Sequence, residues 1–178
     1  INPVLRIKNS KFQTPELDPL LLMEIDLVLA MMRDRYSEQV CNYFEFAFFS
    51  GLCTSELIAL HWGDIDFRRN QACVSKAFVE GEIKPTKTNR IRYVDLNSRS
   101  RSALMRQKQH TYLADAHVFL NPSTGKAWAD DYRQRINYWH PTLKALGLRA
   151  RDAYQTRHTY ATLLLMSGAN PAYVAQQL

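Results

Sequence analysis

The sequence predicts a mainly helical α+β fold with one small antiparallel sheet of three strands. Two long stretches near its start have apolar residues three and four positions apart, which is the spacing of one helix face. Residues 64–96 change to short stretches with β-strand character, and helical spacing returns in the second half. A chain of 178 residues is long enough to bury the core of one domain.

The first half is expected to hold three helices. "LLLMEIDLVLAMMRDR" follows Pro19 and has the pattern of an amphipathic helix. "SEQVCNYFEFAFFSG" comes next, with Ser37 as N-cap and Gly51 as its end, and its aromatic residues predict the central core helix. "TSELIAL" is a short third helix, which Thr54 or Ser55 would cap.

Three strands are expected to follow these helices. They are predicted at "DIDF", "ACVSKAFVE" and "RIRYVDL", the last with alternating apolar residues. The polar, lysine-bearing "EGEIKPTKTN" would form a long connection between the second and third strands.

The second half is expected to be helical again. "SRSRSALMRQKQHTYL" would be a helix capped by Ser98 or Ser100, followed by the buried run "HVFL" and the turn "NPSTG". "DDYRQRINYWHPTLKALG" predicts a helix that Pro141 would kink or divide. "YQTRHTYATLLLMSG" predicts a helix that ends at Gly168, and the last helix would have Pro171 at its first position.

Composition argues against a membrane-spanning or secreted protein. No apolar stretch is long enough to cross a bilayer, and the N-terminus lacks the apolar segment of a signal peptide. The three cysteines are odd in number and widely spaced, which favours reduced cysteines in an intracellular protein over disulfides or a zinc site.

The positive charge is concentrated in the middle of the chain. Residues 1–67 carry a net charge of −5, residues 68–110 carry +8 and residues 111–178 carry +3. A clustered basic segment predicts a polyanionic partner, nucleic acid first, although a solvated surface with no partner is the alternative.

No cofactor or metal is predicted. The chain has neither a GxGxxG motif nor the GxxxxGKS or GxxxxGKT motif that holds nucleotide phosphates. Asp64 and Asp66 would share one strand face, but two carboxylates are weak support for Mg²⁺, and ordinary acids at a strand end are the favoured interpretation.

Three separated motifs resemble the catalytic domain of tyrosine recombinases, the phage-integrase family. They are "SGLCTSELIALHWGDID", "KPTKTNRIRYVDL" and "YQTRHTYATLLLMSGANPAYVAQQL", in the family's order and on its expected elements. The resemblance covers the whole chain and implies an interdomain linker at residues 1–18 followed by the helical catalytic domain at 19–178.

The resemblance also implies an activity and partners. The family carries out site-specific recombination and phage DNA integration through a 3′-phosphotyrosine, without metal or ATP. The implied partners are double-stranded DNA at attachment sites and other recombinase protomers in a synaptic complex. The implied location is the bacterial cytoplasm, at the nucleoid, with no membrane partner.

The family's charged catalytic residues map onto this chain by motif. Arg157 in "TRHT" matches the second catalytic arginine, whose guanidinium donors suit a phosphate, although a surface or capping arginine is the alternative. Lys87 in "PTKTNR" matches the hairpin lysine that protonates the leaving oxygen, with Lys84 as a rival. The resemblance further implies a DNA face formed by the basic hairpin residues Lys84, Lys87, Arg90 and Arg92.

Neighbouring residues are assigned in the same way. Tyr154 occupies the place that histidine usually holds, and it is equally compatible with a half-buried aromatic residue at a helix start. His158, assigned to the DNA-binding set, is expected to act by packing or indirect support rather than catalysis. Glu56 matches the family's acid, which could hold the neighbourhood of the first arginine by hydrogen bonding.

Two departures from the family pattern are expected to affect activity. Cys53 stands where the family has its first catalytic arginine, and a thiol offers one weak donor and no fixed positive charge. The nucleophilic tyrosine would lie beyond Leu178, so this chain is expected to be inactive. The alternatives are a decayed or truncated integrase remnant that binds only DNA or a partner, and an unrelated basic DNA-binding module.

Overall fold

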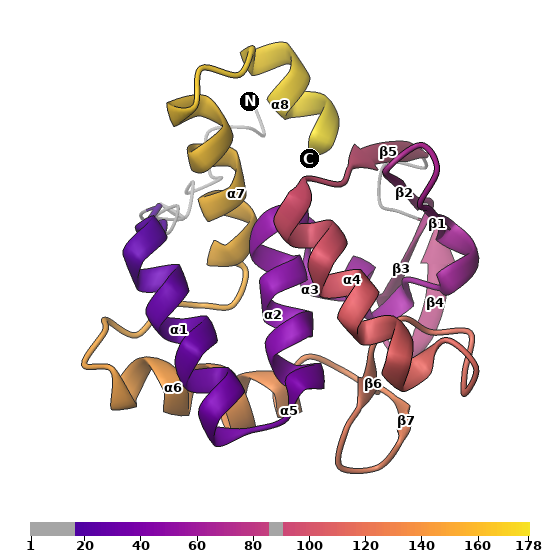
Figure 1. The fold of residues 1–178 in the computed structure, drawn as a ribbon, viewed down its shortest axis with the longest axis horizontal. Coiled ribbons are helices and arrows are strands. Elements are labelled where there is room, and N and C mark those ends of the chain that lie inside the picture. Colours follow the sequence, from indigo (N-terminus) through magenta and orange to yellow (C-terminus); the bar gives the residue numbers. More distant parts are fainter. Residues whose placement is uncertain (1–16, 86–90) are drawn as a thin grey trace, which may run out of the picture.

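A computed structural model describes residues 17–85 and 91–178 of the chain. The helices form one part of the molecule, and the strands between residues 65 and 95 lie together at its side (Figure 1). No helix in these two ranges is both long and apolar enough to cross a membrane. The mainly helical α+β class with small antiparallel sheets is therefore confirmed.

Helix α2 (Glu38–Ser50) is the centre of the core, as its aromatic composition predicted. Every residue from Val40 to Ser50 is buried, and α2 packs against α1 (Leu22–Arg35), α4 (Ser98–Thr111) and α7 (Gln155–Met166). Ser37 caps the helix by accepting a hydrogen bond from the Val40 amide. The helix ends at Gly51, whose φ of +68° favours glycine.

Two predicted helix caps are wrong. Helix α3 (Thr54–Ala59) is preceded by Cys53 as its N-cap, rather than by Thr54 or Ser55, because the Cys53 amide donates to the Glu56 carboxylate across the first turn. Helix α4 is capped by Asn97, whose side-chain oxygen accepts from two backbone amides at 3.0 Å.

The described strands form three small sheets rather than the single sheet that was predicted. β1 (Ile65–Asp66), β2 (Gln71–Val74) and β5 (Arg92–Asp95) form the expected three-stranded antiparallel sheet, in the order β1-β2-β5. The predicted strand at residues 72–80 is instead interrupted at Ser75. Its second half, β3 (Lys76–Val79), pairs with β4 (Glu82–Pro85) in a separate hairpin.

The hairpin forms where the sequence suggested a polar connection. The two residues that join β3 to β4, Glu80 and Gly81, both have positive φ, 54° and 85°. A two-residue turn with this conformation matches the right-handed twist of two paired strands. The first half of the predicted polar connection therefore forms strand β4 rather than a loop.

A short hairpin and three further helices complete the fold. The short hairpin of β6 (Leu120–Asn121) and β7 (Lys126–Ala127) follows α4. α5 (Tyr132–Gln134) passes through a π-helical turn at Arg135–Trp139 into α6 (His140–Ala145), so the segment around Pro141 is irregular rather than divided. α8 (Pro171–Gln177) has Pro171 at its first position, as predicted.

Candidate active site

Glu56 is the centre of the candidate site. Its carboxylate, 8% exposed, accepts hydrogen bonds from the Cys53 amide at 2.9 Å and from the guanidinium groups of two arginines. Arg92 binds it through two nitrogens, at 2.6 and 2.8 Å, and Arg157 through one, at 3.2 Å. Residues from all three motifs therefore meet on one buried carboxylate.

The charge of Glu56 is stabilised by these partners. Burial alone would raise the pKa of the carboxyl, but the hydrogen bonds and positive charge of Arg92, with contributions from the Cys53 amide and Arg157, lower it below its ordinary value. Glu56 is therefore a carboxylate that orients two guanidinium groups.

Arg157 is held from several sides. Besides Glu56, its guanidinium donates to the carbonyl oxygens of Gly51 and Leu178, and its side chain is 17% exposed. The fork of donors thus has a fixed orientation at the start of α7, between the α2–α3 corner and the end of α8. This placement differs from that of a free surface arginine.

Arg92 has a different position from the expected one on a DNA face. Its side chain is only 16% exposed, and its guanidinium is occupied by Glu56 and by the carbonyl oxygen of Gln177. The strand pattern contained a signal for this: Arg92 and the fully buried Val94 lie on one face of β5, whereas Tyr93 is exposed. Arg92 therefore helps to hold the Glu56 carboxylate, which in turn binds Arg157.

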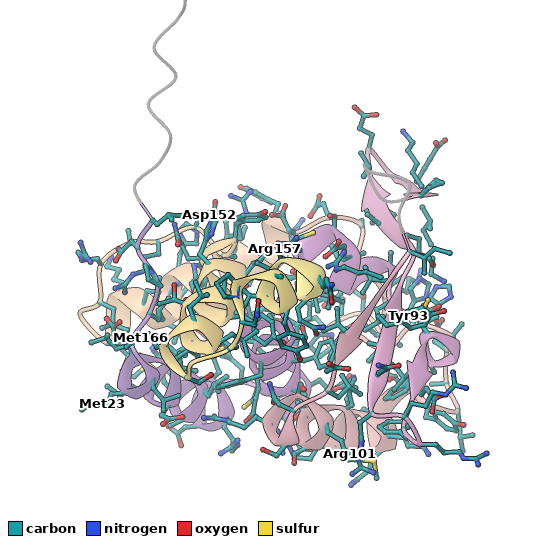
Figure 2. All side chains as sticks on the ribbon, turned by 90° about the horizontal axis from the view of Figure 1, so that it is seen from above. Met23, Tyr93, Arg101, Asp152, Arg157 and Met166 are labelled. Atoms are coloured by element: carbon teal, nitrogen blue, oxygen red, sulfur yellow. The ribbon has the colours of Figure 1, made fainter. Side chains whose placement is uncertain are left out.

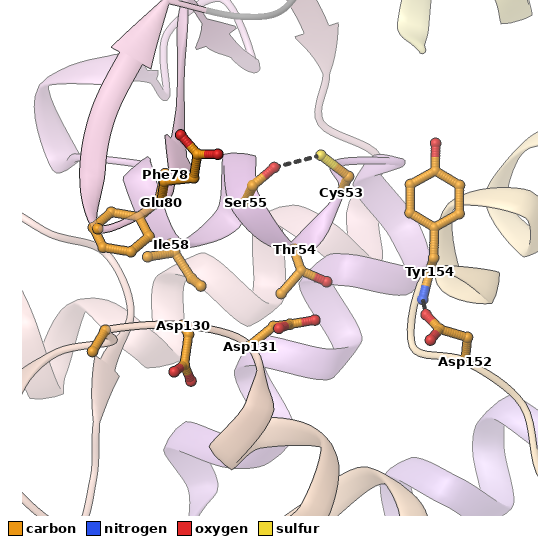
Figure 3. Close-up of a pocket in the computed structure, with 12 residues that line it drawn as sticks. Cys53, Thr54, Ser55, Ile58, Phe78, Glu80, Asp130, Asp131, Asp152 and Tyr154 are labelled. Carbon is orange, nitrogen blue, oxygen red and sulfur yellow. Dashed lines mark hydrogen bonds between the residues drawn. The ribbon is translucent and has the colours of Figure 1, made fainter.

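Cys53 lies beside a cavity of about 550 Å³. Its sulfur is 3.2 Å from the Ser55 hydroxyl, and Tyr154 lines the same cavity (Figure 3). Burial, with a contribution from Glu56, raises the pKa of the thiol, so Cys53 adds no negative charge near neutral pH. The carboxylates that line the cavity belong to Glu80, Asp130, Asp131 and Asp152.

Tyr154, the N-cap residue of α7, forms a pair with His158 in the first turn of the helix. Their rings meet edge to face with centroids 5.1 Å apart, and the Tyr154 side chain is about half exposed. Burial and the neighbouring Arg157 lower the pKa of His158, which favours its neutral form. Both residues lie close to Arg157. Tyr154 lines the cavity beside Cys53, and His158 directly follows Arg157 in the sequence.

The hairpin residues are described only in part. Lys84 lies on β4 and forms exposed ion pairs with Glu80 at 3.2 Å and Glu82 at 3.9 Å, which contribute little to stability. Lys87 and Arg90 lie outside the described residues, so their expected positions stay predictions.

A clasp between β5 and α8 was not predicted. The Tyr173 hydroxyl donates to the Asp95 carboxylate at 2.8 Å, and the Asp95 amide donates to the Gln177 side chain at 2.7 Å. Burial and the bond to Asp95 raise the pKa of Tyr173 to about 12. Burial also raises the pKa of Tyr160, whose ring covers Gly51, so both tyrosines have the surroundings of scaffold residues.

No metal-binding cluster is found in the described part of the chain, where no three His, Cys, Asp or Glu side chains lie close enough together to hold an ion. Asp64 instead forms an ion pair with Lys76 at 3.2 Å, and Asp66 accepts hydrogen bonds from the amides of Arg68 and Arg69. Both acids therefore have structural partners.

Most of the chain matches a known protein family. The family model described as "Phage integrase family" matches residues 22–178. The chain belongs to the phage integrase family. The resemblance seen in its three motifs is thereby confirmed.

Curated relatives of this integrase-family chain come from Escherichia coli K12. It is 29% identical over 191 residues to prophage integrase IntR, covering 94% of this chain and 46% of the relative. It is 26% identical over 186 residues to putative defective protein IntQ, covering 90% of this chain and 46% of the relative. The chain thus spans about half the length of these relatives.

Solved structures share the fold of the chain. The Tn1549 transposon integrase in complex with a circular intermediate DNA aligns with a TM-score of 0.79 and 20% identity, covering 93% of this chain and 58% of that one. A lambda integrase dimer bound to a COC′ core site aligns with a TM-score of 0.69 and 14% identity, covering 90% and 56%. At these identities the likeness shows the fold.

The Glu56 cluster predicts a loss of stability in acid. Because the folded-state pKa of Glu56 is lowered, its stabilising effect is present above the ordinary pKa of 4.5 and is lost as pH falls below it. Urea unfolding between pH 7 and pH 3 should therefore show a steeper loss for the native chain than for Glu56→Gln, which cannot titrate. Parallel curves for the two proteins would contradict this interpretation.

Proposed function

We propose that the chain is the DNA-cleaving domain of a site-specific recombinase of the phage-integrase type. The observation that supports this most strongly is the gathering of Arg157, Arg92 and Cys53 around Glu56, because these residues come from the family's three motifs. The relative named as a prophage integrase and the structures of integrases on DNA support the same function.

In the proposed reaction, a tyrosine hydroxyl attacks a DNA phosphodiester and forms a 3′-phosphotyrosine with release of a 5′-hydroxyl. The bond energy stays in the covalent intermediate, so rejoining needs no ATP. Arg157, oriented by Glu56, would donate to the non-bridging oxygens as negative charge develops on them. Lys87 would protonate the leaving oxygen, and Tyr154 would add a hydrogen bond to the phosphate.

The proposed partners are double-stranded DNA at attachment sites and further recombinase protomers in a synaptic complex. Residues 1–18 would serve as the linker to a preceding domain, and residues 19–178 would form the catalytic domain. Such a protein would act at the bacterial nucleoid.

A second candidate function is DNA or partner binding without cleavage. Cys53 favours it, because a thiol at the place of the family's first arginine cannot neutralise a phosphate. The two functions differ in whether a chain that carries the tyrosine can form a covalent adduct with DNA.

DNA binding should depend steeply on salt. Each phosphate contact contributes about 0.9 to the slope of log affinity against log salt for duplex DNA. We expect Lys87→Ala with Arg90→Ala to reduce this slope by about 1.8 in fluorescence anisotropy with a labelled duplex. Affinity of the native chain that stays constant between 50 and 200 mM salt would contradict DNA binding through the basic hairpin.

A further inference from the structure

The basic side chains of residues 68–110 do not all lie on a single face of the molecule. Arg92 is bound to Glu56, and Arg99 and Arg106 both pair with the buried Glu45 of α2, so these three guanidinium groups have partners within the protein. A separate group lies where the β1–β2 turn meets α4. We define this group as the α4 basic surface; it consists of Arg68, Arg69, Arg101 and Lys108.

Two of the cations of the α4 basic surface are held in place by one aromatic ring, that of Phe67. Arg101 and Lys108, two turns apart on α4, place their charged ends 5.8 and 5.6 Å from the centre of the Phe67 ring. Arg101 also donates to the Asn70 side chain at 2.9 Å, which ties the turn to the helix. The turn is thus fixed against α4 by three contacts.

The same turn presents Arg68 and Arg69 to solvent. The Asp66 carboxylate accepts hydrogen bonds from both of their backbone amides at 2.9 Å, and this fixes the backbone without using either guanidinium. The Arg69 side chain is 79% exposed, and its 3.8 Å pair with the exposed Asp66 is a weak one. Both side chains border a surface hollow of about 480 Å³ that also includes Tyr93, which is 58% exposed.

This surface is separate from the candidate active site. In Figure 2, Arg101 lies at one edge of the molecule and Asp152, which lines the Cys53 cavity, lies at the opposite edge. A DNA duplex bound over the cavity would leave the α4 basic surface available.

We propose that the α4 basic surface binds the sugar–phosphate backbone of DNA at a second place on the domain. The proposal rests on the proposed function, because a protein that acts on DNA in multi-protomer complexes meets more than one DNA segment. Exposed guanidinium groups suit phosphate oxygens. Among the ion pairs of the described residues, only the weak pair of Arg69 with Asp66 involves this surface, so most of its positive charge can face a polyanion.

The test is a pair of double substitutions with the same loss of charge. Arg68→Ala with Arg69→Ala should make the salt slope of duplex binding shallower by about 1.8, since two phosphate contacts are removed. The backbone hydrogen bonds to Asp66 remain in this variant. The control is Arg35→Ala with Lys144→Ala, which removes two exposed basic side chains, on α1 and α6, that belong neither to the α4 basic surface nor to the lining of the Cys53 cavity, and it should leave the slope unchanged. Hydrogen exchange should also show DNA-dependent protection of residues 67–70.

The outcomes separate this proposal from the function on which it rests. If the native chain binds no duplex DNA, both fail. If the native chain binds with a steep slope, and the Arg68/Arg69 variant keeps that slope without protection of the turn, only the second surface is refuted. Unchanged DNA binding combined with weaker self-association of the variant would instead assign the surface to a protein partner and overturn the proposal.

Discussion

Replacing Glu56 by alanine should lower the free energy of unfolding by about 3–5 kcal/mol, because removal of one member of a buried charge cluster leaves its partners unpaired. The partners are Arg92 and Arg157, whose side chains are 16% and 17% exposed and whose guanidinium groups have few other acceptors. The cap of α3 would be lost in the same variant, since the Cys53 amide donates to Glu56. Chemical unfolding monitored by circular dichroism measures this change.

A matched control comes from the hairpin turn. Glu80 also pairs with a basic residue, Lys84, but its side chain is 82% exposed, so Glu80→Ala should change the unfolding free energy by less than about 1 kcal/mol. If the two alanine variants had equal stability, Glu56 would not be the residue that organises the site.

Introducing arginine at position 53 should have the second large effect, on the rate of DNA cleavage. In a chain that carries the family's tyrosine-bearing segment, Cys53→Arg should raise the cleavage rate by about a hundred- to a thousandfold, the usual effect of one preorganised transition-state donor. The cavity of about 550 Å³ beside Cys53 has room for the longer side chain, and its carboxylate-bearing lining favours a positive charge. Covalent adduct formation with a nicked suicide substrate reports this rate.

Two further variants separate charge from size. Cys53→Ser adds no charge and should stay within a few-fold of the native chain, whereas Cys53→Lys adds a charge without the bidentate fork and should fall between serine and arginine. Equal cleavage by the cysteine and arginine forms would mean that position 53 is not the arginine site.

The sequence was most informative where local chemistry decides the structure. Ser37 and Gly51 bound α2 as predicted, because a side-chain cap and a left-handed glycine act within one turn. The cap of α3 was missed because Cys53 acts through its backbone amide and the Glu56 side chain rather than through its own side chain. Asn97 was overlooked in favour of the serines that follow it.

The sequence pointed to candidate site residues but not to the hydrogen bonds that connect them. The motifs contain Glu56 and Arg157, but which guanidinium groups bind Glu56 depends on the tertiary placement of β5 and α7 relative to α3, which local sequence patterns do not determine. The clasp between Asp95, Tyr173 and Gln177 joins residues about 80 positions apart, and no periodicity marks it. The separate hairpin of β3 and β4 depends on a turn at Glu80, a residue that rarely adopts positive φ.

The proposed catalytic role of position 53 implies that it faces the same scissile phosphate as Arg157. It can be tested directly with a nicked substrate whose scissile phosphate is replaced by a methylphosphonate, which lacks the negative charge that an arginine would neutralise. In a chain that carries the tyrosine, the cysteine and arginine forms at position 53 should differ by about a hundredfold or more on the phosphate. They should differ by less than about tenfold on the methylphosphonate, since little charge remains to be stabilised. The same large difference on both substrates would contradict the claim, because position 53 would then act on folding or DNA binding rather than on the charge of the reacting phosphate.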